Sequence, residues 1–259
     1  MLKGLYTAYT GMINEQHRMD TMTNNLANSS TVGFKKEGAT SQSFDALLAY
    51  KLKDSSVGIG NVQRIGVNTP GVKIGENYTD YTQGSFRETG NTFDLALSGS
   101  GFFAIEYTNN AGETSTKYTR AGSFTLDQKG YLVDKDGNYV LDSNNRRIQL
   151  DPLQSASIDK TGAIYQNGVL KSTVQVADFE DYNYLEKYGD TFYQPVEGAS
   201  LTDGKASVVS GYLEMSNVNV VSEMVNMISI TRAYETNQKI LQTYDGSLDI
   251  AVNQIGKLR

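Results

Sequence analysis

Apolar residues recur at alternating steps of three and four at both ends of the chain. Near the start, the apolar positions of this pattern are Leu2, Leu5, Tyr9, Met12, Met19 and Leu26. Near the end, they are Val220, Met224, Met227, Tyr234, Leu241, Leu248, Val252 and Ile255. A repeat of about 3.5 residues is typical of a helix that presents one apolar seam to partner helices. The pattern predicts a long helix at each end, with these residues in a subunit interface.

The middle of the chain follows a different pattern, with short alternating runs that turn residues separate. Phe93, Leu95 and Leu97 alternate with polar neighbours. The spacers, such as Asp-Gln-Lys-Gly at 127–130, have the composition of hairpin turns. This part of the chain is therefore predicted to form an antiparallel β domain.

Together these patterns predict an α+β fold. The long N- and C-terminal helices are expected to pair as a coiled coil, with a central, mainly antiparallel β domain between them. The predicted boundaries are an N-terminal helix and joint at 1–34, an extended connector at 35–85, the β domain at 86–210 and the C-terminal helix at 211–259. The two helical segments would form one layer, from which the β domain extends as a separate body.

A dense run of small polar residues follows the first predicted helix. Asn, Ser and Thr side chains can bond to the last helical backbone groups and build turns, and Gly33 can take a positive φ. The predicted joint between helix and β domain consists of Asn24, Asn25, Leu26, Ala27, Asn28, Gly33 and Phe34. Two interpretations stay open from the residues alone: a simple helix stop, or a joint that also contacts neighbouring subunits.

Charge and composition argue against several classes of function. The net charge of −6 argues against a nucleic-acid binder, which usually carries a basic face. The chain has no cysteine, which excludes disulfides, thiol catalysis and thiolate metal sites. No stretch reaches the roughly 18 apolar residues of a membrane span, and the N-terminal residues lack the apolar run of a cleaved signal peptide. We therefore expect no membrane insertion, and export without a cleaved signal if the protein is exported.

Several features that resemble chemical sites have simpler interpretations. His17 is the only histidine of the chain, so a metal site around it is not expected. The Asp-Lys-Asp-Gly-Asn run at 134–138 departs from the spacing of a calcium loop and fits a hairpin turn. Ser98–Gly101 lacks the lysine of a phosphate loop, and the acidic residues at 178–181 fit a solvated loop. We predict no catalytic, cofactor-binding or metal-binding residue, and no enzyme activity.

Four segments carry a resemblance to a known family. NNLANSSTVGFKK at 24–36 resembles the N-terminal motif of the bacterial flagellar rod and hook proteins, and SNVNVVSEMVNMISITRAYETNQKILQT at 216–243 resembles their C-terminal motif. SGSGFFAI at 98–105 and YTRAGSFTLDQKGYLV at 118–133 are similar to their core β segments. The length is similar to that of the rod proteins, in a proximal or a distal position, rather than to that of the longer hook protein.

The resemblance implies a structural subunit of the flagellar basal body that needs no cofactor. It implies that the paired terminal helices form an inner coiled-coil layer, that the β domain lies outside it, and that subunits stack helically to transmit torque. The implied partners are copies of the chain, other rod and hook proteins and the flagellar export apparatus, with no nucleic acid. The alternative from the residues is a secreted adhesin or cell-wall hydrolase that oligomerises through coiled-coil ends.

Overall fold

The computed structural model describes residues 2–44, 47–51, 63–69, 71–109 and 112–255. The chain divides into two compact units. The first unit contains Met1–Leu26, Glu37–Asp80 and Val220–Arg259, and the second contains Ala27–Lys36 and Tyr81–Asn219. The chain therefore passes between the units several times, and segments from both of its ends belong to the first unit.

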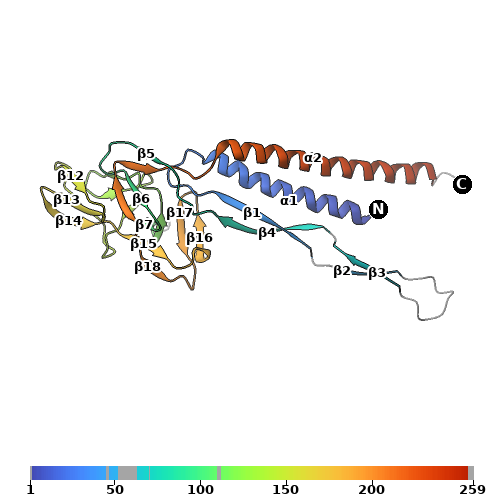
Figure 1. Ribbon diagram of the computed structural model, residues 1–259, viewed down its shortest axis with the longest axis horizontal. Helices are drawn as coiled ribbons and strands as arrows, with labels where there is room; N and C mark the ends of the chain where they lie inside the picture. The colour runs from blue at the N-terminus through green and yellow to red at the C-terminus, as the bar shows by residue number, and fades with distance from the viewer. Residues whose placement is uncertain (1, 45–46, 52–62, 70, 110–111, 256–259) are drawn as a thin grey trace. The chain divides into compact units, whose positions relative to one another are not determined.

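The first unit consists of two long helices and two strand pairs (Figure 1). Its elements are α1 (Leu2–Ala27), β1 (Glu37–Ser43), β2 (Leu47–Lys51), β3 (Gln63–Asn68), β4 (Val72–Thr79), α2 (Val220–Ile250) and a final π-helical turn, η2 (Ala251–Ile255). β1 pairs antiparallel with β4, and β2 pairs antiparallel with β3. The predicted connector thus contains two strand pairs in its described part, while residues 45–46, 52–62 and 70 of that prediction lie outside the described residues.

Polar side chains join α1 to the strand pair formed by β1 and β4. The Asn14 side-chain amide donates to Ser41 Oγ at 2.9 Å. The Asn25 amide donates to the Glu37 carbonyl at 2.7 Å, and its Oδ1 accepts from the Glu37 backbone N–H at 2.9 Å. Both asparagines are buried, so β1 gives their polar groups the partners that burial requires.

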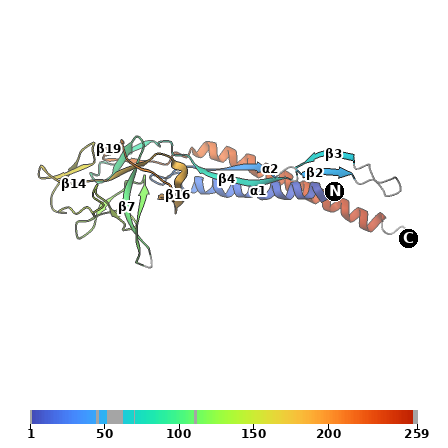
Figure 2. The ribbon, with the colours of Figure 1, turned by 90° about the horizontal axis from the view of Figure 1, so that it is seen from below.

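The predicted coiled-coil pairing of the two helices is wrong. The buried residues of α1 include Ala8, Asn14 and Asn25, and those of α2 are Glu223 and Ile230, none of them an apolar residue of the predicted seam. The helices run antiparallel, as both views show (Figures 1 and 2), and meet where Gly4 faces the Tyr244 ring and Gly11 faces Asn237.

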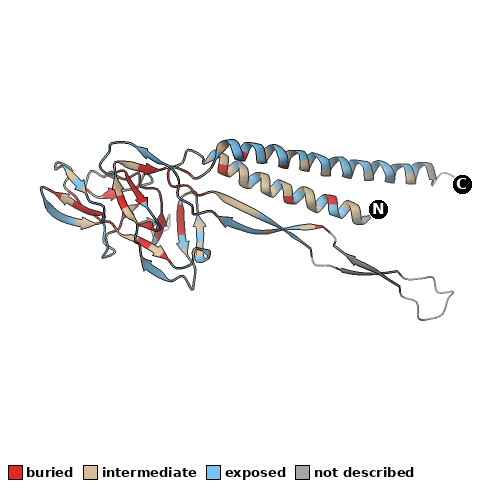
Figure 3. Cartoon of the chain, viewed as in Figure 1, coloured by how far each residue is buried: buried red, intermediate tan, exposed pale blue. Residues whose placement is uncertain are grey.

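The two helices do not form a coiled coil because other elements cover part of the surface that a coiled coil would bury. A coiled coil requires each seam residue to fit between four residues of the facing helix. Instead, part of α1 is covered by the β1–β4 pair, and α2 approaches it at glycines. Most of α2 is exposed along its length (Figure 3).

The second unit is built almost entirely from antiparallel strands. Its elements are β5 (Phe86–Glu88), β6 (Leu95–Ser98), β7 (Phe102–Thr108), β8 (Thr114–Thr119), β9 (Thr125–Leu126), β10 (Leu132–Val133), β11 (Tyr139–Val140), β12 (Ala156–Ile158), β13 (Ala163–Gln166), β14 (Val169–Thr173), β15 (Val176–Phe179), η1 (Tyr182–Tyr184), β16 (Leu185–Tyr188), β17 (Phe192–Pro195), β18 (Leu201–Asp203), β19 (Ser207–Ser210) and β20 (Tyr212–Glu214). The largest sheet has the order β16-β17-β8-β7-β11-β10-β9, with β15 pairing β7 and β18. The two terminal helices and the antiparallel β-rich centre are therefore as the sequence predicts.

Strand β7 forms the centre of the core because both of its faces are buried. Phe103 and Ile105 belong to one apolar cluster, with Leu95 and Leu132 among its members. Phe102 belongs to a second cluster, and its ring lies 5.4 Å from the ring of Tyr193 between centroids. The second unit thus has apolar clusters on both faces of β7, and Figure 3 shows that most buried residues of the chain lie in this unit.

Candidate functional site

The loop that follows α1 turns at Gly33, and only glycine fits there. Gly33 has a φ of +72°, and a Cβ on it would lie 2.3 Å from the backbone nitrogen of Ala121. Its own N–H donates to the Glu214 carbonyl at 2.8 Å. A larger residue would meet both a strained conformation and a backbone clash, so the sequence-predicted glycine is fixed by its surroundings.

The residues around Gly33 anchor this loop to the second unit. Phe34 is fully buried, and the Lys187 ammonium lies 4.1 Å from the centre of its ring. Val32 packs in a small apolar cluster with Ala121 and Leu213. The loop that the sequence predicts as a joint therefore docks with its apolar side chains inward.

A buried group of charges lies next to this anchor. Lys35 Nζ lies 2.6 Å from Glu214 Oε1, and Arg120 Nη1 lies 3.3 Å from Glu214 Oε2. The exposed fractions of the three side chains are 1%, 4% and 0% for Lys35, Arg120 and Glu214. Glu214 Oε1 also accepts from the Gly84 backbone N–H at 3.0 Å. Charges are buried in this way only when they are paired and hydrogen-bonded.

These bonds join the three segments by which the chain enters and leaves the second unit. Lys35 Nζ also donates to the Thr82 carbonyl at 2.7 Å, which links residues 27–36 to residues 81–85. Asn217 Oδ1 accepts from the Lys36 backbone N–H at 2.8 Å, and its Nδ2 donates to Thr82 Oγ1 at 3.0 Å. The Met215 N–H donates to the Ser85 carbonyl at 2.8 Å. The segments are thus held in one register.

The remaining joint residues lie around the end of α1. The Thr31 hydroxyl donates to Asn28 Oδ1 at 2.9 Å, which closes the turn after the helix. Asn25 bonds to Glu37 within the first unit, whereas Ala27 is exposed. Asn24 and Leu26 are both half-buried. The predicted joint residues therefore divide between the two units, and the chain crosses between them after Leu26.

The described side chains of the predicted seam are half-buried or exposed on the two helices. Leu5, Met12, Met19, Leu26, Val220, Met227, Tyr234 and Leu241 are half-buried. Tyr9, Met224, Leu248 and Val252 are exposed, with exposed fractions of 48%, 48%, 36% and 69%. The side chains of Leu2 and Ile255 lie outside the described residues. The exposure of the predicted seam residues thus differs along the two helices.

Sequence reasoning missed the buried charges. Lys35, Arg120 and Glu214 are far apart in sequence, and each belongs to a residue type that is usually exposed. Lys35 lies within the NNLANSSTVGFKK segment, which was the one signal available. In the described ranges, no group of three or more His, Cys, Asp or Glu side chains is arranged as a metal site. Neither described helix has the length and apolarity needed to cross a bilayer.

Known protein families match three separate parts of the chain. The family described as "Flagella basal body rod protein" matches residues 5–35, "Flagellar hook protein FlgE/F/G D1 domain" matches 96–166, and "Flagellar basal body rod FlgEFG protein C-terminal" matches 209–255. The matched regions contain both helices, the joint and the centre of the main sheet.

Full-length relatives support the same assignment. The chain is 34% identical to the flagellar basal-body rod protein FlgG of Bacillus subtilis, over 98% of this chain and 99% of that protein. It is 32% identical to the flagellar basal-body rod protein FlgF of Caulobacter vibrioides, over the full length of both. It is 29% identical to the flagellar hook-basal body complex protein FlhO of Bacillus subtilis, again over the full length of both. The chain therefore belongs to the family of flagellar basal-body rod proteins and is a structural subunit of the rod in the basal body.

Proposed function

We propose that this subunit polymerises helically through its terminal helices and transmits torque along the rod. The observation that supports this proposal is an apolar surface on α2. Val221, Val225 and Ile228 have exposed fractions of 72%, 61% and 55%, and Met224 beside them is 48% exposed. Steps of four and three residues place them on one face of the helix. Such a contiguous apolar surface marks a site of association.

The exposed residues of the predicted seam extend the proposed contact surface. Tyr9 on α1 and Leu248 on α2 have apolar side chains that the chain leaves 48% and 36% exposed. Contacts between different surfaces of identical subunits generate an open helical polymer when the rotation between neighbours does not close a ring. Neighbouring copies of this chain, and other rod proteins with similar helices, are the proposed occupants.

The buried charges next to the joint suit a subunit under mechanical load. Lys35, Arg120 and Glu214 hold the three crossing segments in one register within the second unit. Because each oxygen of Glu214 accepts from particular donors, a sliding motion of one segment would break bonds that water cannot replace in a buried site. We expect this arrangement to limit compliance where the chain leaves the β unit.

The export route is part of the same proposal. We infer passage through the flagellar export apparatus as an unfolded chain, without a cleaved signal. The absence of cysteine supports this inference, because no disulfide must be broken or formed on the way. Deletion of residues 1–36 is expected to leave the protein in the cytoplasm of flagellated cells, as measured by fractionation. Secretion of the deleted chain at the normal level would contradict the proposal.

The test of assembly is a triple substitution on the exposed face of α2. Val221→Ser, Val225→Ser and Ile228→Ser together are expected to abolish concentration-dependent assembly in sedimentation velocity and electron microscopy. The circular dichroism of the monomer should stay unchanged, because these side chains are exposed. The matched control is Leu153→Ser, which removes an apolar side chain that is 94% exposed in the second unit. Assembly of the triple variant at the wild-type concentration would refute the proposed contact surface.

A further inference from the structure

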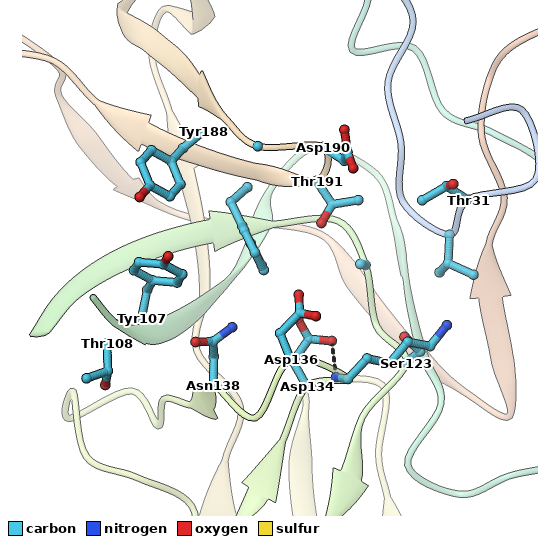
Figure 4. A pocket seen from close by; sticks show the side chains of 15 residues that line it. Thr31, Tyr107, Thr108, Ser123, Asp134, Asp136, Asn138, Tyr188, Asp190 and Thr191 are labelled. Carbon is cyan, nitrogen blue, oxygen red and sulfur yellow. Dashed lines mark hydrogen bonds between the residues drawn. The ribbon is translucent and has the colours of Figure 1, made fainter. Parts of the chain in front are cut away.

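A hollow of about 550 Å³ lies within the second unit where several segments meet. The turn between β10 and β11 forms one wall, and the turn between β16 and β17 forms the opposite wall (Figure 4). The end of β7 contributes Tyr107, and residues 31 and 32 of the joint loop complete the lining. The rod role described above does not use this hollow.

The charges that line the hollow are mainly negative. Asp134, Asp136 and Asp190 contribute three carboxylates, and Lys135 contributes one ammonium group. Asp134 is only 6% exposed, and burial is the main cause that raises its pKa to about 6, with the Asp136 charge adding to the rise. A backbone hydrogen bond from Lys135 N–H, 2.6 Å long, opposes the rise in pKa. The lining therefore favours a cationic ligand.

The hollow also contains a buried hydrogen-bond donor without an acceptor. Asn138 is 7% exposed, and within the described ranges its Nδ2 has no hydrogen-bond partner. In Figure 4 its side chain extends from the same turn as Asp134 and Asp136, toward Tyr107. Because an unpaired buried donor is unfavourable, a ligand that completes this site should bring an acceptor oxygen as well as a positive charge.

The size and aromatic wall of the hollow distinguish between possible cations. Among the described residues the carboxylates do not converge as metal ligands, and the volume is far larger than a bare ion needs. Tyr107 and Tyr188 form one wall, with ring centres 5.4 Å apart in an edge-to-face arrangement. The Lys117 ammonium lies 3.7 Å from the Tyr188 ring centre and 5.7 Å from that of Tyr107, so it already occupies one cation position on this wall. A planar guanidinium can stack on such a ring and bind carboxylates at the same time.

We propose that the hollow binds an arginine side chain carried by an extended segment of another polypeptide. The guanidinium lies between the carboxylates of Asp136 and Asp190, and a backbone carbonyl of the same segment accepts from Asn138 Nδ2. An arginine-containing peptide segment supplies both the cation and the acceptor oxygen that this lining favours. This proposal goes beyond the rod role and is tested on the monomer, so the two can fail separately.

The experiment is a titration of the isotope-labelled full chain with a short arginine peptide, followed by amide chemical shifts. The probe is acetyl-Gly-Arg-Gly-amide, and its matched control replaces arginine with citrulline, which keeps the shape but loses the charge. The arginine peptide should shift the amides of 134–138 and 188–191 saturably. The citrulline peptide should bind at least about tenfold more weakly, because a charge-assisted bond is lost.

Substitutions in the protein separate the proposed site from nonspecific charge attraction. Asp136→Asn and Asp190→Asn remove carboxylates that are exposed at the rim, so both variants should fold. Each is expected to weaken binding by roughly fivefold or more. The matched control is Asp159→Asn, another exposed turn aspartate, whose carboxylate accepts from the Lys160 N–H at 2.8 Å outside the hollow.

Three results would overturn the proposal. The first is equal binding of the arginine and citrulline peptides, and the second is a shift pattern that lies outside the two turns. The third is a saturable response of the same amides to calcium alone that also blocks the peptide, which would make the hollow a metal site. Any of these results would reject arginine binding in the hollow, but none would bear on the assembly test, which uses the exposed face of α2.

Discussion

Replacement of Glu214 by glutamine tests whether the buried charges hold the second unit together. The Glu214 carboxylate accepts from Lys35 Nζ at 2.6 Å, from Arg120 Nη1 at 3.3 Å and from the Gly84 N–H at 3.0 Å. Glutamine keeps one acceptor oxygen, but it places an NH₂ donor against a buried cation. Removal of one partner from a buried ion pair costs about 3–5 kcal/mol. The retained oxygen places Glu214→Gln near the lower end of this range, at about 3 kcal/mol.

Urea unfolding measures this cost directly. The chain has 17 tyrosines and no tryptophan, so tyrosine fluorescence and far-ultraviolet circular dichroism are the natural signals. With a slope of about 2 kcal/mol per molar urea, the expected loss lowers the midpoint of the second unit by about 1.5 M. Amide exchange in residues 33–36 and 81–85 should accelerate in parallel, because these segments lose their shared partner.

The matched control is Glu106→Gln, which removes a carboxylate from an exposed ion pair. Arg147 Nη2 lies 2.7 Å from Glu106 Oε1, and Arg147 Nε lies 2.9 Å from Glu106 Oε2. The Arg147 side chain is 44% exposed and the Glu106 side chain is 19% exposed. Exposed pairs contribute about 0–1 kcal/mol, so the midpoint should fall by about 0.5 M or less. If Glu214→Gln and Glu106→Gln shift the midpoint equally, the reasoning from burial is wrong.

Further predictions concern the joint loop and the hollow. Gly90→Ala should destabilise the second unit by about 1–2 kcal/mol, because Gly90 has a positive φ. Gly33→Ala should cost roughly twice as much in urea unfolding, because Gly33 also has a positive φ and a Cβ on it would meet the backbone of Ala121. Phe34→Ala should cost about 3–5 kcal/mol in the same assay, and Phe86→Ala, at a 42% exposed side chain, about 1 kcal/mol. The folded-state pKa of Asp134, near 6, lies above its ordinary value of 3.8, so folding takes up a proton between these values and stability falls as pH rises through them. The free energy of unfolding of Asp134→Asn should equal that of the wild type at low pH and exceed it by up to about 3 kcal/mol above pH 7. A difference between the two proteins that stays constant across this pH range would contradict the raised pKa of Asp134.

Local periodicity was sufficient to predict the kinds of element but not their partners. The steps of three and four in α1 and α2 predict helices correctly, because the helical repeat is a property of the segment alone. The same repeat cannot say which surface covers the apolar face. In α1, Asn14 and Asn25 are buried against β1, and a polar residue in a helix gives no sign from its spacing that a strand will hydrogen-bond to it.

The second unit shows the same limit at its centre. Phe103 and Ile105 lie two residues apart on one face of β7, and both belong to a core cluster. Their neighbours Phe102 and Ala104 are equally buried, because a second cluster that includes Phe179 and Tyr193 packs on the other face of β7. That cluster joins residues far apart in the chain, so no local pattern encodes it. The predicted domain boundaries, the interface role of the seam residues and the joint's contacts with neighbouring subunits stay predictions.

The buried charges say more about position than about stability. An apolar set of similar volume at Lys35, Arg120 and Glu214 is expected to stabilise the fold about as well, because desolvation offsets much of the attraction within a buried ion pair. Apolar contacts, however, are not directional, and they would tolerate a slip of residues 33–36 against residues 214–217. A slip by one residue would turn the Lys35 side chain to the opposite face and leave Glu214 buried without its shortest bond. The triple variant Lys35→Met, Arg120→Met and Glu214→Leu should therefore keep its urea midpoint, yet show faster amide exchange where the crossing segments meet. Unchanged amide exchange would mean that backbone bonds, such as that from the Gly33 N–H to the Glu214 carbonyl, fix the register without the charges.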